Sequence, residues 1–266
     1  MTASSREAAP AGRGPASVSA VLPAHNEIAV IAGVVERTYD ALRAAGIAAF
    51  EVVVVDDGST DGTGDAVRDV AQRLSKAKAS RISVVTHSVN RGYGAALRTG
   101  FEHARHDVVW LMDSDGQFDP ADLPILLGAW QPGRFVAGYR ARRADPLSRR
   151  LNHNAFFGLV RVALGPTVRD VNCAFKLFPR HVGIGLHADG AMVSTELILR
   201  ARAQGVEIVE VVVPHHPRTA GTPTGANPRV VAKAFAELWQ LRSALQRQRP
   251  KVAERDIDQR HEPELR

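Results

Sequence analysis

The sequence predicts an α/β protein in which a mostly parallel sheet carries helices on both faces. Short β-branched runs alternate with stretches of helical periodicity, as in folds built from βαβ units. Runs such as "EVVVV" at 51–55 are apolar at consecutive positions, which is typical of strands covered on both faces. The 266 residues, 45% of them hydrophobic and 23% charged, fit one soluble globular domain with appendages.

The first half of the chain supplies the regular part of this pattern. The expected strands are 17–23, 50–57, 81–87, 107–113 and 134–140, and the expected helices are 28–45, 63–78 and 94–105.

After residue 140 the pattern continues less regularly. We expect a basic loop at 140–150, helices at 151–164 and 194–205, strands at 173–180 and 206–214, and a loop at 214–229. No internal repeat is found, and four segments follow: a flexible tail at 1–16, the domain at 17–229, an amphipathic helix at 230–248 and a charged flexible tail at 249–266.

Charge and cysteine usage narrow the class of protein. A net charge of +6 and a pI near 10.0 suit a polyanionic partner such as nucleic acid, an anionic membrane surface or a phosphorylated small molecule. Cys173 is the only cysteine, so an intramolecular disulfide is excluded and a reducing compartment is expected. Because no apolar run of spanning length or secretory signal is seen, we expect a cytoplasmic protein, with peripheral contact on the cytoplasmic face of the membrane left open.

Ligands of such sheets bind beyond the carboxyl ends of the strands, so the residues there matter most. The first strand ends in "LPAHNE", where Asn26 alone is explained by helix capping. The second ends in "VVDDGSTDGTGDA", where turn formation explains residues 59–61. Asp56 and Asp57 favour function, because two negative charges at a buried strand end are costly without a partner.

The segment "VVWLMDSDGQFDP" at 108–120 carries the sharpest signal. If the chain stays extended, Asp113, Asp115 and Gln117 present oxygen atoms on one side, a set suited to Mg²⁺ or Mn²⁺. Asp119 and Pro120 are explained as the cap and first residue of a helix.

The sequence contains no phosphate-binding P-loop. The segment "NRGYGAALRTG" at 90–100 is a glycine-rich loop that opens a helix, and it either approaches a phosphate or allows close packing.

Taken in order, "LPAHNE", "VVDDGSTDGT", "NRGYGAAL" and the Asp-x-Asp-x-Gln segment resemble a family 2 glycosyltransferase of the GT-A fold. Within that family the chain is most similar to the dolichyl- or polyprenyl-phosphate sugar synthases, over residues 18–222. The resemblance implies that a nucleoside diphosphate sugar, with guanine or uracil left open, is bound by Pro23, His25, Glu27, Asp56, Asp57, Asp113 and Ser114. It also implies that Mg²⁺ or Mn²⁺ is bound by Asp113, Asp115 and Gln117.

The second half adds an acceptor site to this resemblance. "GYRARR", "RDVNCAFKLFPR", with Ala174 where glycine is usual, and "VVVPHHPRTAGTP" resemble the family's later segments. They imply that an acceptor phosphate is held by Arg140, Arg143, Lys176 and Arg218. The residues expected to be catalytic are Asp115, Arg140 and Arg218.

The expected reaction is inverting, metal-dependent sugar transfer to a polyprenyl or dolichyl phosphate. Many relatives have a Glu-Asp pair that supplies a base, whereas here Glu196 is followed by Leu197. A phosphate acceptor is already an anion and needs positioning and charge screening instead of deprotonation. Residues 134–150 contain six arginines and one aspartate, a local charge of +5 that suits such an acceptor.

Two alternatives stay open. In the first, the acceptor is a soluble metabolite or protein, and Glu196 or a neighbouring residue acts as the base. In the second, the chain is a non-catalytic protein that binds a nucleotide sugar or nucleic acid. Nucleic acid is disfavoured as a partner because Tyr139 is the only aromatic residue beside the basic loop. The oligomeric state is left open.

Overall fold

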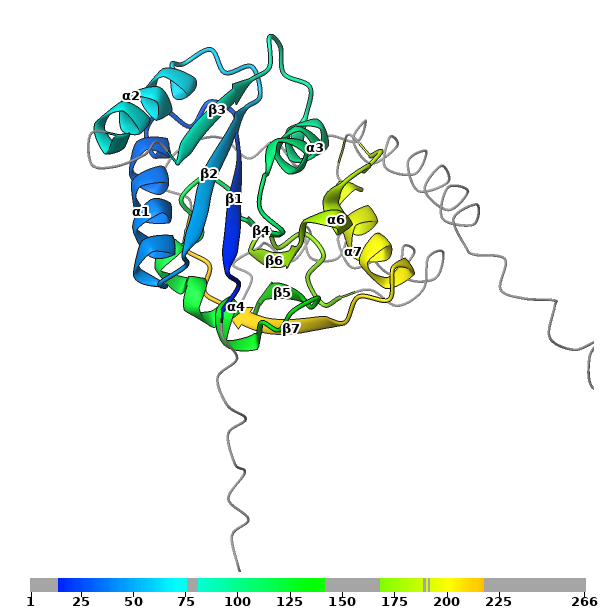
Figure 1. Cartoon of the computed structure of the whole chain (residues 1–266). Coiled ribbons are helices and arrows are strands. Elements are labelled where there is room, and N and C mark those ends of the chain that lie inside the picture. Colours follow the sequence, from blue (N-terminus) through cyan, green and yellow to red (C-terminus); the bar gives the residue numbers. More distant parts are fainter. Residues whose placement is uncertain (1–13, 76–80, 142–167, 189, 191, 218–266) are drawn as a thin grey trace, which may run out of the picture.

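The computed structural model describes residues 14–75, 81–141, 168–188, 190 and 192–217 (Figure 1). Their centre is a seven-stranded sheet with the order β3-β2-β1-β4-β6-β5-β7. The strands are β1 (Ser17–Ala24), β2 (Ala49–Asp56), β3 (Ile82–Thr86), β4 (Val108–Leu111), β5 (Phe135–Arg140), β6 (Lys176–Pro179) and β7 (Ile208–Val213).

The sheet is parallel except at β6. Strand β1 pairs in parallel with β2 and β4, β2 with β3, and β5 with β7, whereas β6 is antiparallel to both β4 and β5. The expectation of a mostly parallel sheet in an α/β fold is therefore confirmed. The reversal of β6 was not predicted, because a four-residue buried strand has no local signature of its direction.

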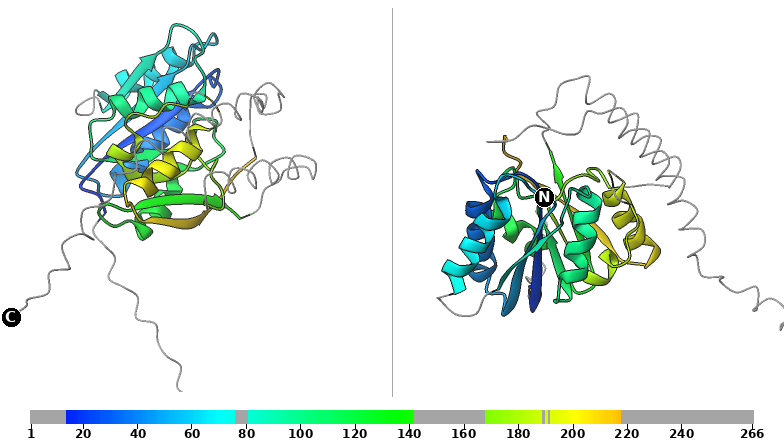
Figure 2. Two further views of the ribbon diagram at one scale, coloured as in Figure 1. Left: turned by 90° about the vertical axis from the view of Figure 1, so that its right-hand side faces the viewer. Right: turned by 90° about the horizontal axis from the view of Figure 1, so that it is seen from above.

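Helices cover both faces of this sheet, as Figure 1 and the view from above in Figure 2 show. The helices are α1 (Ile31–Ala44), α2 (Thr63–Ser75), α3 (Tyr93–His103), η1 (Pro120–Asp122, a 3-10 turn), α4 (Leu123–Ala129), α6 (Arg180–Gly183) and α7 (Val193–Ala203). Helices α1, α2 and α4 pack on one face, and α3, α6 and α7 on the other.

The run of valines in β2 shows why strands of this type carry no polar alternation. Val52 and Val54 belong to the hydrophobic cluster under α1 and α2, whereas Val53 lies between them in sequence and belongs to the cluster under α3. All three side chains are fully buried. Successive side chains of a strand point to opposite faces, so both faces must be apolar when both are covered.

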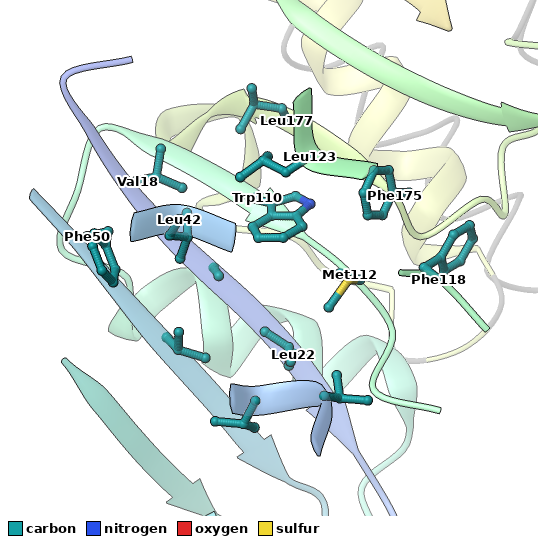
Figure 3. Close-up of a cluster of buried hydrophobic side chains, with 14 of the residues drawn as sticks. Val18, Leu22, Leu42, Phe50, Trp110, Met112, Phe118, Leu123, Phe175 and Leu177 are labelled. Atoms are coloured by element: carbon teal, nitrogen blue, oxygen red, sulfur yellow. The ribbon is translucent and has the colours of Figure 1, made fainter. Parts of the chain in front are cut away.

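Aromatic packing supports the part of the sheet that carries the site (Figure 3). The ring of Trp110 in β4 meets Phe175 edge to face, with centroids 5.7 Å apart, and Phe118 stacks on Phe175 at 5.4 Å. Phe118 also contacts the ring of His215, which follows β7. The segments on either side of the acidic loop at 113–117 are thus fixed by a shared core.

The five early strands and three early helices appear within a few residues of their expected positions. Asp119 accepts a 3.0 Å hydrogen bond from the Ala121 backbone N–H and caps η1, as predicted. Most of the basic loop, the helices expected at 151–164 and 230–248 and nearly all of both predicted tails lie outside the described residues. Within the described ranges, no helix has the length and apolar character needed to cross a bilayer.

Candidate active site

Most of the predicted site residues that the structure describes lie at one edge of the sheet. The parallel strands end there, with Ala24 of β1 beside Asp56 of β2. Because β6 runs the other way, it begins at the same edge, and its first residue, Lys176, pairs with Leu111 at the end of β4 and with Ala137 of β5. Residues far apart in sequence therefore meet at the position where α/β sheets bind their ligands.

Asp113 is a half-buried carboxyl group just beyond β4. The Tyr93 hydroxyl at the start of α3 donates a 3.0 Å hydrogen bond to its Oδ1 atom. Burial and the nearby charge of Asp115 raise the pKa of Asp113 to about 6, although Tyr93, Lys176 and Arg140 oppose this shift. The positive charges and the hydrogen-bond donor around Asp113 are thus too few to offset the cost of ionising its carboxyl group.

Asp115 and Gln117 do not continue β4 as an extended strand. The chain bends through residues 114–118, and Gly116 has a φ of 75°. The expectation that three alternate residues share one side of an extended segment is therefore wrong in its geometry. Asp115 is buried and accepts a 3.0 Å hydrogen bond from the Gln117 backbone N–H, while the Gln117 side-chain amide donates to the His216 carbonyl at 3.2 Å.

The two aspartates fit a hard divalent cation. Carboxylate oxygens are the ligands that Mg²⁺ and Mn²⁺ prefer, and a cation would offset the burial and the charge of Asp115 that raise the pKa of Asp113. Among the described residues, no group of three or more acidic, histidine or cysteine side chains is arranged to hold a metal ion. Gln117, the third ligand expected from the sequence, lies two residues after Asp115 and stays a prediction.

Arg140, at the end of β5, is held by a carboxylate that the sequence analysis did not single out. Its Nε and Nη2 atoms donate to the two oxygens of Asp170 at 2.6 and 2.9 Å, in a bidentate and mostly buried pair. The Asp170 carboxylate fixes the direction of the guanidinium group. The sequence signal was the segment "RDVNCAFKLFPR" itself, whose one acidic residue is Asp170.

Lys176 is fully buried, and its ammonium group donates to the carbonyl oxygens of Val171 and Cys173. Burial lowers its pKa, and the charges of Cys173, Asp170 and Asp113 oppose that effect. Lys176 lies beside Leu111 at the end of β4, and its ammonium group holds the segment before β6. Arg143 and Arg218, the other two predicted phosphate ligands, lie outside the described residues.

Asp56, the last residue of β2, and Asp57 are both buried and differ in their contacts. Asp56 accepts a 3.0 Å hydrogen bond from the Ser59 backbone N–H. Asp57 accepts from three donors: the His87 ring at 2.6 Å and the backbone N–H groups of Arg91 and Gly92 at 2.9 and 2.8 Å. These donors explain how a carboxylate is tolerated at a buried strand end.

The "PAHNE" segment is joined to the loop after β2. The His25 ring donates to the Asp57 carbonyl at 3.0 Å, and Asn26, with a φ of 56°, accepts from the Thr60 backbone N–H at 2.9 Å. The Glu27 backbone N–H donates to the Thr63 hydroxyl at 2.8 Å. Asn26 thus fixes a contact between two loops, and it is not the N-cap of α1, which is Val30.

Pro23 and Ser114 connect the first and fourth strand ends. The buried Ser114 hydroxyl donates a 2.6 Å hydrogen bond to the Pro23 carbonyl. This contact ties the start of the acidic loop to the start of the "PAHNE" segment.

Glu196, on the first turn of α7, is buried. Its carboxylate accepts hydrogen bonds of 2.8 to 3.0 Å from the backbone N–H groups of His187 and Ala188 and a 3.1 Å bond from the His187 ring. In this arrangement the carboxylate holds the loop before α7.

Three residues that the sequence analysis missed, His87, Tyr93 and Asp170, all hold a predicted site residue in place.

Comparison with known proteins agrees with this architecture. Residues 19–183 match the family model described as Glycosyl transferase family 2. A curated relative, undecaprenyl-phosphate 4-deoxy-4-formamido-L-arabinose transferase from Pectobacterium carotovorum, is 31% identical over 210 residues. The match covers 77% of this chain and 62% of that protein, so the chain spans about three-fifths of the length of this relative.

Solved structures share the fold at lower identity. Glucosyl-3-phosphoglycerate synthase from Mycobacterium tuberculosis, in complex with Mn²⁺, UDP-glucose and phosphoglyceric acid, has a TM-score of 0.61 at 22% identity and covers 84% of this chain and 80% of its own. The mannosyltransferase PcManGT from Pyrobaculum calidifontis, in complex with GDP-mannose and Mn²⁺, has a TM-score of 0.54 at 20% identity and covers 84% and 64%.

Proposed function

The chain belongs to the family 2 glycosyltransferases, and on that premise we propose that it moves a sugar from a nucleoside diphosphate sugar to a polyprenyl phosphate. The observation that carries the proposal is the pair Asp113 and Asp115 at the ligand-binding edge of the sheet, where burial and the nearby charge of Asp115 raise the pKa of Asp113 to about 6. The curated relative is named for transfer of a sugar to undecaprenyl phosphate, which supports a lipid phosphate as the acceptor.

The donor would lie across the ends of β1, β2 and β4. Pro23, His25, Glu27, Asp56 and Asp57 are proposed to bind its nucleoside. Asp113, Ser114, Asp115 and Gln117 are proposed to bind its diphosphate side. When bound, Mg²⁺ or Mn²⁺ would neutralise negative charge on the diphosphate. The solved structures named above contain UDP-glucose or GDP-mannose with Mn²⁺, which supports the donor class and leaves the base open.

The chain's own residues would then position the acceptor. Its phosphate oxygen attacks the anomeric carbon as the bond to the diphosphate breaks, and approach from the opposite face inverts that carbon. Arg140, fixed by Asp170, is placed at the end of β5 to hold an anionic oxygen. Arg143 and Arg218 are proposed to contribute further positive charge. Lys176, being buried, would act through the electrostatic field at Asp113.

The contacts of Glu196 favour an acceptor that needs no base. Its oxygens accept bonds from two backbone N–H groups and a histidine ring. Both oxygens are thus occupied by the loop at 187–188, and a substrate hydroxyl could reach them only by displacing part of these contacts. A phosphate acceptor is already ionised, whereas a sugar or glycerate hydroxyl must lose a proton.

The direct test is release of nucleoside diphosphate from a panel of UDP- and GDP-sugars, with Mn²⁺ or Mg²⁺, with and without a short-chain polyprenyl phosphate. Release from one donor that depends on the lipid phosphate would support the proposal. Asp115→Asn should lower that rate by roughly 100-fold or more. The matched control is Asp119→Asn, which keeps an N-cap on η1 and should leave the rate near wild type.

Other outcomes separate the alternatives. Release without lipid, increased by a phosphorylated metabolite, would favour a soluble acceptor, the class of molecule in the mycobacterial structure. Full activity of Asp115→Asn with intact folding would contradict the proposed metal site. Absence of release from every donor would favour a binding protein without catalytic activity. Co-sedimentation with anionic vesicles would test the proposed membrane contact.

A further inference from the structure

His87 lies at the centre of a hydrogen-bond network on the donor side of the site. It follows β3 directly, and its side chain is buried. Its Nδ1 atom lies 2.6 Å from Oδ1 of Asp57, and its Nε2 atom lies 2.9 Å from the Thr99 hydroxyl of α3. Because a carboxylate only accepts, Nδ1 carries the proton and donates. The ring therefore joins the end of β2 to the middle of α3.

The carboxylate of Asp57 is almost completely used by these contacts. Oδ1 accepts from His87 and from the Arg91 backbone N–H, and Oδ2 accepts from the Gly92 backbone N–H. A carboxylate offers about four acceptor positions, so the contacts within the described residues leave one of them, on Oδ2. The His87 ring, together with the two backbone N–H groups, thus fixes the direction of that remaining position.

The same network reaches the acidic loop. Gly92 is the N-cap of α3 and has a φ of 93°, and its N–H donates to the Asp57 carboxylate at 2.8 Å and to the Asn90 side-chain oxygen at 3.0 Å. The next residue, Tyr93, donates through its hydroxyl to Asp113. The contacts therefore run from Thr99 through His87, Asp57 and the 91–93 backbone to the proposed metal site.

We propose that His87 is a positioning residue of the donor site: it holds Asp57 so that one carboxylate position stays available to an N–H or O–H group of the donor nucleoside. Through the 91–92 backbone it also sets the place of Tyr93 against Asp113. This inference rests on the proposed function, because it gives Asp57 a nucleoside to bind. The sequence analysis did not identify His87, which follows β3 outside any of the motifs it described.

The test uses the full-length protein and three variants. His87→Ala removes the ring. His87→Asn keeps an N–H donor close to the position of Nδ1. His103→Ala is the matched control, because His103 is on α3 and donates to the Thr99 carbonyl but lies on the exposed side, away from Asp57. Two quantities are measured: the dissociation constants of UDP and GDP with Mn²⁺, and the hydrogen exchange of the Arg91 and Gly92 amides.

For His87→Ala we expect nucleotide binding weaker by about tenfold or more and amide exchange at 91–92 faster by a similar factor, as for loss of one buried hydrogen bond to a charged group. In turnover, the KM for the donor should rise more than kcat falls. His87→Asn should restore most of both quantities, and His103→Ala should match wild type.

The outcomes distinguish this inference from the proposed function. If wild type binds a nucleotide and His87→Ala binds it equally well, the positioning role is overturned and the proposed function stands. Unchanged exchange at 91–92 in His87→Ala would also overturn it. If the wild-type protein binds neither nucleotide, both the proposed function and this inference are overturned.

Discussion

The Tyr93 hydroxyl donates a 3.0 Å hydrogen bond to Oδ1 of Asp113, joining the glycine-rich loop that opens α3 to the acidic loop after β4. The bond stabilises the ionised carboxylate, whose pKa burial and Asp115 raise to about 6. Desolvation of the phenol and the charge of Asp113 in turn raise the pKa of Tyr93 well above its usual value, so Tyr93 stays a donor at neutral pH.

Tyr93→Phe should therefore raise the pKa of Asp113 further. A metal ion competes with the proton for this carboxylate, so the Mn²⁺ affinity measured with a nucleoside diphosphate present should fall about tenfold at pH 6 and much less at pH 8. Tyr39→Phe, on α1 and packed against Phe50, is the control. An equal loss of affinity at both pH values would contradict this role of the hydroxyl.

Asp113→Asn should stabilise the metal-free protein. The folded-state pKa of about 6 lies above the ordinary value of 3.8, so the ionised carboxylate costs stability as pH rises from about 4 to above 6. The variant should gain about 1 to 3 kcal/mol in urea unfolding at pH 7.5 and little at pH 4.

The exposed Asp40→Asn on α1 is the control for Asp113→Asn and should show no such difference between the two pH values. Mn²⁺ with nucleotide should raise the melting temperature of wild type and not that of Asp113→Asn. A destabilised Asp113→Asn at pH 7.5 would show that the carboxylate is compensated within the fold.

Loss of the Arg140–Asp170 pair should lower the unfolding free energy far more than loss of a surface ion pair. Asp170→Ala leaves a mostly buried guanidinium without its partner and should cost about 3 kcal/mol of unfolding free energy. Glu36→Ala breaks the exposed Arg73–Glu36 pair and should cost less than about 1 kcal/mol. Equal losses for the two variants would mean that Arg140 finds solvent or another partner.

A comparison of Gly58 with Gly46 distinguishes the cost of a left-handed backbone from the cost of close packing. Both have a φ of 68°, but a Cβ on Gly58 would overlap the backbone of Val89 and Asn90, whereas a Cβ on Gly46 would meet no atom within 4 Å. Gly46→Ala should cost about 1 kcal/mol for the left-handed conformation alone. Gly58→Ala should cost roughly 3 kcal/mol and disturb nucleotide binding, because the loop after β3 must move. Similar losses in calorimetry would contradict the close approach.

Local sequence patterns located most of the fold and most of the candidate site. Strand β2 was visible because both faces of the sheet are covered, so its valines need no polar alternation. Asp56, Asp57 and Asp113 could be proposed because each lies at or within two residues of the end of a buried strand, and α/β sheets bind ligands at that edge. Covalent neighbours fix such features, so one stretch of sequence is enough to reveal them.

The amino-acid sequence by itself determined the α/β class, the order of its strands and helices in the chain, and the family to which it belongs. Only the tertiary structure decided that β6 runs antiparallel and brings Lys176 to the site edge, that Asp170 binds Arg140, and that His87 binds Asp57. The members of each of these last two pairs are 30 residues apart in the chain. Their contacts arise from strand order and burial, because a buried charge must find a partner wherever the fold supplies one.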